Sequence, residues 1–163
     1  MSDMHNVIIE RLKAAGARYV IHEHVEARTV AESLERLPFP LELYLTTVAF
    51  RLKQGGWALV GRRGTDRIDY KKVAAALGVK REQISIPAAE EVLTGLGIET
   101  GTVSPIPTVE GMTVVMDSQL PWGVPLYAGA GKAGRTLEIT LDDVLRVTGG
   151  RVANVVKAEA ENA

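Results

Sequence analysis

The chain has 163 residues and a mass of 17.6 kDa, with 19 Lys and Arg against 20 Asp and Glu and a pI near 6.3. Hydrophobic residues make up 46% of it, enough for one domain with its own core, which excludes a disordered chain, a collagen or a coiled coil. It has no cysteine, so a disulfide scaffold, thiol catalysis and thiolate metal sites are excluded. Because there is neither an apolar run of ~18 residues nor the apolar segment of a signal peptide, we expect a soluble, cytoplasmic protein.

Hydrophobic spacing and turn residues predict the elements of the first half of the chain. In chain order they are a helix over 4–15, a strand over 18–24, a helix from 29 that Pro38 stops, a hairpin of 44–52 and 57–60, and a helix from Asp69 to Gly78. Asp3 and Asp69 are suited to cap their helices, and Thr29 forms a capping box with Glu32.

The second half is richer in glycine and has shorter elements. We predict a short helix from Pro87, a Gly-, Thr- and Pro-rich segment over 95–107, strands over 112–116, 124–128 and 136–139, a helix over 140–148, and a last strand over 152–156. Strands and helices are interspersed without regular βαβ alternation. The sequence therefore predicts an α+β fold, a single domain over 1–163 with a mixed, curved β-sheet and packed helices.

The charge is unevenly distributed. Residues 50–81 contain nine Lys and Arg and only two Asp, a net charge of +7, whereas the stretches before and after are acidic. Such a cluster can steer a polyanion to one face of a protein. A solvated helix face with strand-edge lysines is the alternative interpretation.

The stretch Gly129-Ala-Gly131-Lys-Ala-Gly134 matches the dinucleotide-binding pattern G-x-G-x-x-G. That pattern requires a helix after its third glycine, but residues 135–139 alternate like a strand, which argues against nucleotide binding. A P-loop is also excluded, since Ala133 stands where Ser or Thr should hold magnesium. We interpret the stretch as a glycine loop that lets a ligand or another backbone segment come close.

Two further patterns have alternative interpretations. His22, His24 and Glu26 alternate, so they could form a metal site of two histidines and a carboxylate, or lie as polar residues on the wet face of an edge strand. Residues 97–105 end in Ser104-Pro105, and the proline favours an extended loop whose N–H groups can point at a ligand. A surface Ω-loop is the alternative there.

Several motifs together resemble the YbaK/prolyl-tRNA-synthetase-associated domain over about residues 8–156. They are residues 29–33, 44–52, 69–78, 97–105 and 129–132, followed by Leu137-Glu-Ile139. The resemblance implies a small α+β domain, free-standing or inserted in a synthetase, that hydrolyses wrongly charged aminoacyl-tRNA. It places the pocket between the Gly/Ser-Pro loop and the strand after the second helix. An aminoacyl ester is already activated, so its hydrolysis mainly requires a positioned water molecule and contacts that stabilise the oxyanion.

The sequence departs from the family pattern at two positions. Where the family has a lysine that the resemblance places at the end of the tRNA, near the ester, this chain has Leu45, and a loop glycine is replaced by Thr102. Arg51 is six residues further along the same strand, which is about 20 Å at ~3.3 Å per residue. It is therefore too far away to substitute for this lysine. Lys132 or Arg28 can supply the charge from another element.

The function expected from this resemblance is a trans-editing deacylase for a tRNA carrying a small amino acid. A degenerate member that binds without hydrolysis and a small-molecule binding module are the alternatives. We expect tRNA and an aminoacyl-tRNA synthetase as partners, and no metal, cofactor, DNA or membrane. The candidate residues are Ser104, Gly101 and Lys132 for catalysis; Thr29, Leu45, Thr102, Val103, Pro105, Gly129 and Gly131 for substrate binding; and Arg62, Arg63, Arg67, Lys71 and Lys72 for tRNA binding.

Overall fold

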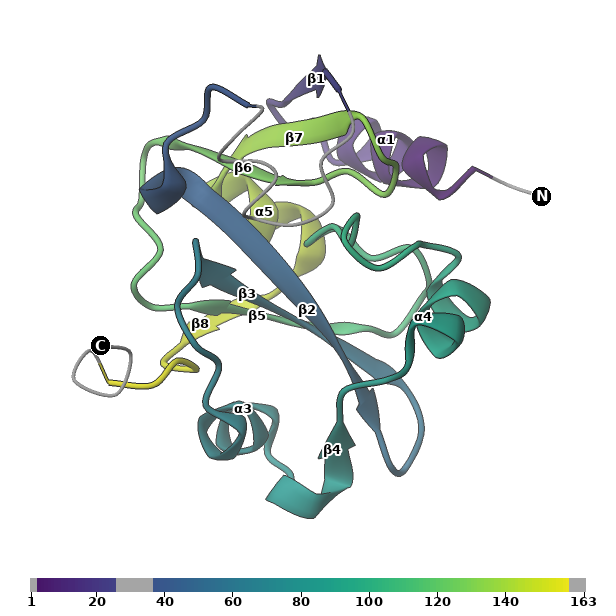
Figure 1. Ribbon diagram of the computed structural model, residues 1–163, viewed down its shortest axis with the longest axis vertical. Helices are drawn as coiled ribbons and strands as arrows, with labels where there is room; N and C mark the ends of the chain where they lie inside the picture. Colours follow the sequence, from purple (N-terminus) through teal and green to yellow (C-terminus); the bar gives the residue numbers. More distant parts are fainter. Residues whose placement is uncertain (1–2, 26–36, 159–163) are drawn as a thin grey trace.

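The computed structural model describes residues 3–25 and 37–158, and its β-strands form one mixed sheet (Figure 1). The strands are β1 (Val20–Glu23), β2 (Tyr44–Leu52), β3 (Trp57–Arg63), β4 (Ile84–Ser85), β5 (Thr113–Asp117), β6 (Pro125–Gly129), β7 (Arg135–Thr140) and β8 (Arg151–Ala153). Their order is β1-β7-β6-β2-β3-β5-β8, with β4 paired to β2. The β2–β6, β3–β5 and β5–β8 pairs are parallel and the others antiparallel, which confirms the predicted α+β fold with a mixed sheet.

Four α-helices lie in the described part of the chain: α1 (Met4–Ala14), α3 (Tyr70–Leu77), α4 (Ala89–Leu96) and α5 (Leu141–Thr148). The predicted caps of α1 and α3 are confirmed. Asp3 accepts a hydrogen bond from the His5 N–H, and Asp69 accepts from the N–H groups of Lys71 and Lys72. The helix predicted from Thr29 lies outside the described residues. No helix in the ranges described is both long and apolar enough to cross a membrane.

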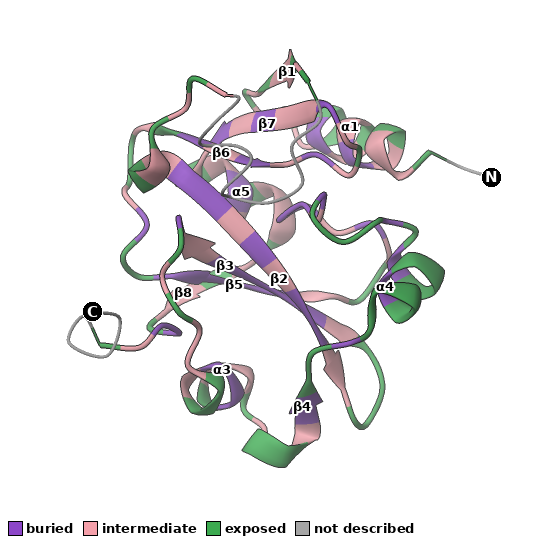
Figure 2. Ribbon diagram, viewed as in Figure 1, coloured by how far each residue is buried: buried purple, intermediate pink, exposed green. Residues whose placement is uncertain are grey.

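Hydrophobic residues form one core on each face of the sheet. The larger core contains buried side chains from α1, α4 and α5, and the smaller contains Val73 and Ala74 of α3. Strand β2 contributes to both, because successive side chains of a strand point to opposite faces: Leu45 and Ala49 belong to the larger core and Phe50 to the smaller. Figure 2 shows the resulting buried stretches along β2 and β5.

Several elements differ from the prediction in their bounds, and β3 extends to Arg63, three residues beyond the predicted strand. Helix α4 begins at Ala89 rather than at Pro87. The last strand was predicted over 152–156, but β8 ends at Ala153 because the next residues bond elsewhere: the Val155 N–H donates to the Asp117 carboxylate at 3.0 Å, and Val156 forms an isolated bridge with Ile68. Strand β4 was not predicted, since two residues are too short to show alternation.

The central feature for function is the short pairing of β2 with β6. These parallel strands pair only where Tyr44 and Leu45 lie beside Tyr127 and Ala128. Beyond that point they diverge across the molecule (Figure 1). The sheet therefore opens beside the first half of β2.

Candidate active site

A pocket of about 300 Å³ lies where β2 and β6 separate. Its walls come from segments that are far apart in sequence. They are Leu37 and Phe39, Tyr44 to Thr47 of β2, Arg62 of β3, Gly101 to Val103, Tyr127 to Gly129 of β6, Lys132, and Arg135 and Thr136 of β7. The loop 97–105 and the glycine loop 129–134 therefore meet at one concave site.

The two loops contact each other directly at this pocket. The Gly131 N–H donates to the Thr102 carbonyl oxygen at 2.9 Å, and the Thr102 hydroxyl donates to the Glu99 carbonyl oxygen at 2.7 Å. At Gly129 a Cβ atom would lie 2.8 Å from the Val103 carbonyl carbon, closer than real side chains come. Glycine is thus needed at position 129 for the backbones to approach.

The pocket lining is cationic. It contains Arg62, Lys132 and Arg135, and no Asp or Glu belongs to the described lining. Burial lowers the pKa of Arg62 from its ordinary value, and the nearby Asp66 carboxylate acts in the opposite direction. Arg135 pairs with Glu23 at 3.2 Å, while the Lys132 ammonium is half-exposed and 4.0 Å from the Asp3 carboxylate. Such a lining favours an anion or a group that develops negative charge.

One buried polar atom in the wall has no partner within the described residues. Thr47 is the last of the four β2 residues that line the pocket and is only 9% exposed. Its hydroxyl oxygen makes no hydrogen bond in the ranges 3–25 and 37–158. A buried hydroxyl without a partner is destabilising by about 1–3 kcal/mol, so this one is suited to bind a ligand atom.

The aminoacyl-tRNA editing domain family matches residues 24–147, which is most of the chain. The chain belongs to this family. It is also 30% identical over 112 residues to a proline–tRNA ligase of Limosilactobacillus fermentum and 29% identical over 110 residues to one of Halalkalibacterium halodurans. These alignments cover 66% and 68% of this chain but 19% of each ligase, so the chain spans about a fifth of the ligases' length.

Solved structures agree on the fold. A hypothetical protein matches with a TM-score of 0.83 and 24% identity, covering 93% of this chain and 99% of its own. A candidate trans-editing enzyme for prolyl tRNA synthetase matches with a TM-score of 0.78 and 20% identity, covering 97% and 99%. The editing domain therefore has the YbaK-like architecture that its sequence motifs predicted.

The structure places six of the ten residues predicted for catalysis or substrate binding in the pocket of the editing domain. Leu45, Gly101, Thr102, Val103, Gly129 and Lys132 line it. Ser104, Pro105 and Gly131 are not among the described lining residues. Ser104 is 1% exposed, and its hydroxyl oxygen accepts the Ile106 N–H at 3.2 Å, so it holds the turn beneath the loop. Thr29 and Arg28 lie outside the described residues, and the catalytic and binding roles all stay predictions.

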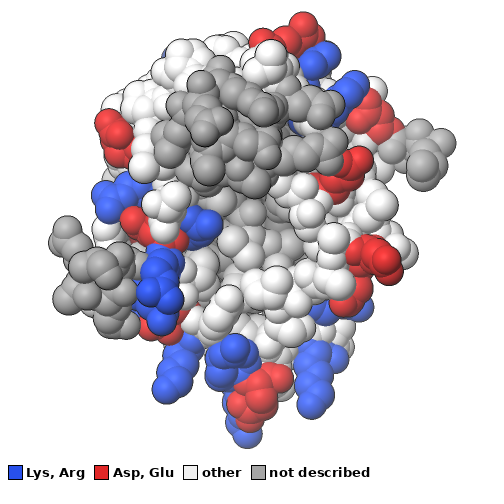
Figure 3. Space-filling view, viewed as in Figure 1, with Lys and Arg blue, Asp and Glu red and all other residues white. Residues whose placement is uncertain are grey.

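The predicted tRNA-binding residues lie in different surroundings. Arg62 lines the pocket, and Arg63, the next residue of β3, pairs with Asp66 at 3.3 Å. Arg67 and Lys71 are exposed, whereas the Lys72 ammonium donates to the Val156 carbonyl oxygen at 2.8 Å. Figure 3 shows basic side chains projecting from the end of the molecule that carries α3 and β4.

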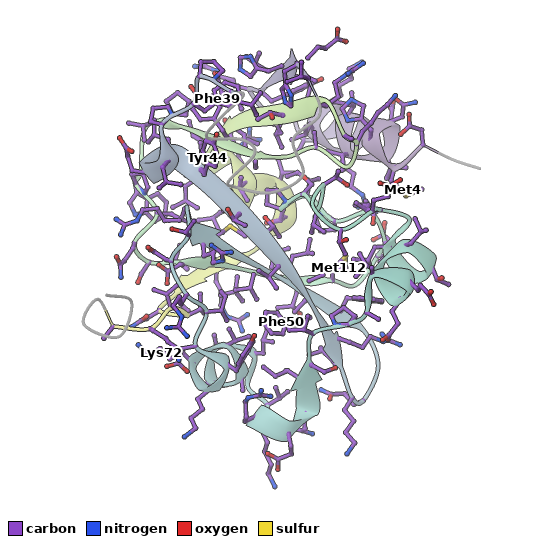
Figure 4. The ribbon with its side chains drawn as sticks, in the orientation of Figure 1. Met4, Phe39, Tyr44, Phe50, Lys72 and Met112 are labelled. Atoms are coloured by element: carbon purple, nitrogen blue, oxygen red, sulfur yellow. The ribbon has the colours of Figure 1, made fainter. Side chains whose placement is uncertain are left out.

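Sequence reasoning missed several pocket residues of the editing domain. Phe39 and Tyr127 stack with ring centroids 4.2 Å apart, and the His22 ring lies 5.2 Å from Phe39. Figure 4 shows Phe39 near Tyr44, at the start of β2. Arg62 was assigned to tRNA binding and not to the pocket, although it lies directly opposite Thr46 in the β2–β3 register.

The alternating histidines and the glycine loop 129–134 have structural explanations. His22 bonds to the Glu138 carboxylate at 2.9 Å and His24 to the Thr136 hydroxyl at 2.6 Å, while Glu26 lies outside the described residues. No cluster of His, Asp and Glu in the described ranges is arranged to hold a metal ion. Strand β7 starts at Arg135, directly after the glycine loop, so this loop opens no helix that could bind a pyrophosphate.

Proposed function

We propose that the chain is a deacylase that acts in trans on a tRNA carrying a wrong, small amino acid. The observation that carries the proposal is the pocket of the editing domain, with its three cations, no described acidic lining residue and the partnerless Thr47 hydroxyl. Action in trans is proposed from the structural similarity to the candidate trans-editing enzyme for prolyl tRNA synthetase. The matches to proline–tRNA ligases support a tRNA and a synthetase as partners.

The reaction is hydrolysis of the ester between the amino acid and the terminal ribose. A water molecule adds to the ester carbonyl carbon, the carbonyl oxygen becomes an oxyanion, and the carbon–oxygen bond to the ribose then breaks. The water supplies the proton that the ribose oxygen takes up, so a free amino acid and a free tRNA end are released. Positioning and oxyanion contacts supply most of the rate in such a step.

Lys132 is the cation that we assign to the oxyanion, in place of the family lysine that Leu45 replaces. It enters from the glycine loop, which the Gly131–Thr102 hydrogen bond fixes against loop 97–105. A flexible ammonium on a fixed backbone can reach a developing charge at the pocket mouth.

The amino acid is small because apolar side chains occupy the inner wall. Leu45 is 2% exposed and packs over Gly61, where a Cβ would lie 2.6 Å from its Cδ1 atom. Together with Tyr44 and Val103 it limits the room for a side chain. Such a pocket distinguishes amino acids that differ by one or two methylene groups, and each methylene group changes the relative rate by about 10-fold to 200-fold.

A deacylation assay with the full chain tests the proposal. Each of a panel of tRNAs charged with Gly, Ala, Ser, Val or Leu is incubated with the protein, and the ester remaining is measured over time. We expect faster loss of the smallest amino acids than of leucine. If no ester is lost although the same protein binds the charged tRNAs, the chain is a binder without activity, which is the second candidate that Leu45 favours.

A further inference from the structure

A second pocket of about 360 Å³ adjoins the first. Arg62 lines both pockets and forms a shared wall. Across the hairpin from Arg62, Thr46 lines the first pocket; Val48, two residues further along the same face of β2, lines the second. At about 3.3 Å per residue, these two positions are about 7 Å apart.

One rim of the second pocket carries cations that the fold brings together from distant parts of the chain. The Lys157 N–H donates to the Arg67 carbonyl oxygen at 2.8 Å, next to the bridge between Ile68 and Val156. This connection places the C-terminal segment beside the loop after β3. Arg62, Arg67 and Lys157 therefore line one pocket, with Asp66 as the one carboxylate in its described lining.

Apart from Thr65, the rest of the described lining of the second pocket is apolar or aromatic. Ile86 is 51% exposed and Tyr70 is 40% exposed, and both line it together with Ile68 and Val48. The Arg81 guanidinium lies 4.8 Å from the centre of the Tyr70 ring and so holds that ring in place. An apolar surface next to a cationic rim matches a nucleotide, which has a flat base and a charged phosphate.

We propose that the second pocket binds the nucleotide that precedes the terminal adenosine of the substrate tRNA. The phosphate that joins the two nucleotides lies at Arg62, the next phosphate at Arg67 and Lys157, and the base against Ile86 and Tyr70. The assignment rests on the proposed function, because it requires the aminoacyl ester in the first pocket. It makes the single-stranded 3′ end, and not the amino acid alone, the recognised part of the substrate.

Two substrates separate this inference from the proposed function. One is the aminoacyl-tRNA and the other is the same amino acid esterified to adenosine, which has no preceding nucleotide. In the variant R67A/K157A, and separately in I86A, we expect kcat/KM for the tRNA to fall about tenfold and the rate on aminoacyl-adenosine to stay unchanged. The control K53A/K80A removes two exposed cations of the same basic stretch that do not line the pocket.

A binding measurement needs no catalysis. A fluorescently labelled RNA trinucleotide with the sequence C-C-A is titrated with each protein over a salt series. We expect R67A/K157A to weaken its binding and to lower the salt slope by about 1 for each phosphate that the variant no longer neutralises, with K53A/K80A matching the wild type.

The kinetic and binding results test the nucleotide site and the deacylase function separately. If the wild type hydrolyses both substrates and R67A/K157A and I86A act on the tRNA at the wild-type rate, the second pocket is not a nucleotide site. Binding of a poly-glutamate peptide in preference to the trinucleotide would likewise overturn it. If the trinucleotide binds as expected but neither ester is hydrolysed, the nucleotide site stands and the deacylase function is wrong.

Discussion

The backbone of Gly129 lies so close to Val103 that no side chain fits between them: a Cβ atom at 129 would lie 2.8 Å from the Val103 carbonyl carbon and 2.9 Å from the Thr102 carbonyl oxygen. Gly129 ends β6, and Val103 belongs to the loop that follows α4. Both residues line the candidate active site. This contact between backbones therefore helps to set the shape of the pocket, together with the hydrogen bond from the Gly131 N–H to the Thr102 carbonyl oxygen.

The first prediction concerns that contact. Gly129→Ala should push loop 97–105 away from β6 and lower deacylation at least tenfold, because small displacements of positioning groups cost about 10²-fold in rate. The free energy of unfolding should fall by about 1–3 kcal/mol, as for overpacking in a core. Deacylation kinetics and urea denaturation measure the two effects. Gly111→Ala is the control, since a Cβ there meets nothing within 4 Å and only its φ of +79° is strained.

The second prediction separates binding from stability at Thr47. Thr47→Val removes the partnerless hydroxyl and keeps the shape of the side chain. We expect kcat/KM to fall about tenfold if the hydroxyl bonds to the substrate, while the free energy of unfolding stays the same or rises slightly. Thr113→Val in β5, away from the pocket, is the matched control. Loss of stability with unchanged kinetics would mean that the hydroxyl has a structural partner.

The order of elements in the described residues could be predicted because local signals decide it. Asp3 and Asp69 cap their helices, and Gly78 has the left-handed φ of +71° that ends α3. The same signals fail where tertiary contacts decide. Val155 looks like strand in the sequence, but its N–H bonds to the buried Asp117 carboxylate, so β8 stops earlier.

The site was predictable only in part for the same reason. The glycines of loop 129–134 indicate that another backbone segment comes close, but they do not indicate which segment. The position of Arg62 opposite Thr46 follows from a hairpin centred on Gln54, whereas a two-residue turn at Gly55-Gly56 would place Ala49 opposite Arg62, so the glycine pair alone does not find it. Likewise, the stacking of Phe39 on Tyr127 joins residues 88 positions apart, and no local pattern predicts it.

The third prediction concerns which cation serves the reaction. Lys132→Ala should lower kcat by about 10²-fold to 10³-fold with little change in KM, as for the removal of an interaction made in the transition state. Arg135→Ala is the matched control, because that guanidinium also lines the pocket but pairs more closely with a carboxylate, at 3.2 Å from Glu23 against 4.0 Å between Lys132 and Asp3. An equal decrease in both variants would show that general positive charge matters and that no single cation is assigned to the oxyanion.

The last prediction concerns Leu45, which stands where the family has lysine. Its side chain is 2% exposed, belongs to the larger core and also forms the pocket wall. A lysine can keep its methylene groups in this apolar site and extend its ammonium into the pocket, so Leu45→Lys should lower the free energy of unfolding by only about 1–3 kcal/mol.

If Lys132 already supplies the charge, Leu45→Lys should add little to the rate of the wild type. In the Lys132→Ala background, however, it should raise the rate at least tenfold, because it returns a cation to the oxyanion from the other wall of the pocket. Leu45→Met in the same background keeps the apolar volume without the charge and should restore nothing. Deacylation rates of the four variants, each verified by its unfolding transition, measure this. A wild-type rate that is indifferent to Lys132, together with no rescue by Leu45→Lys, would place the catalytic charge elsewhere in the pocket.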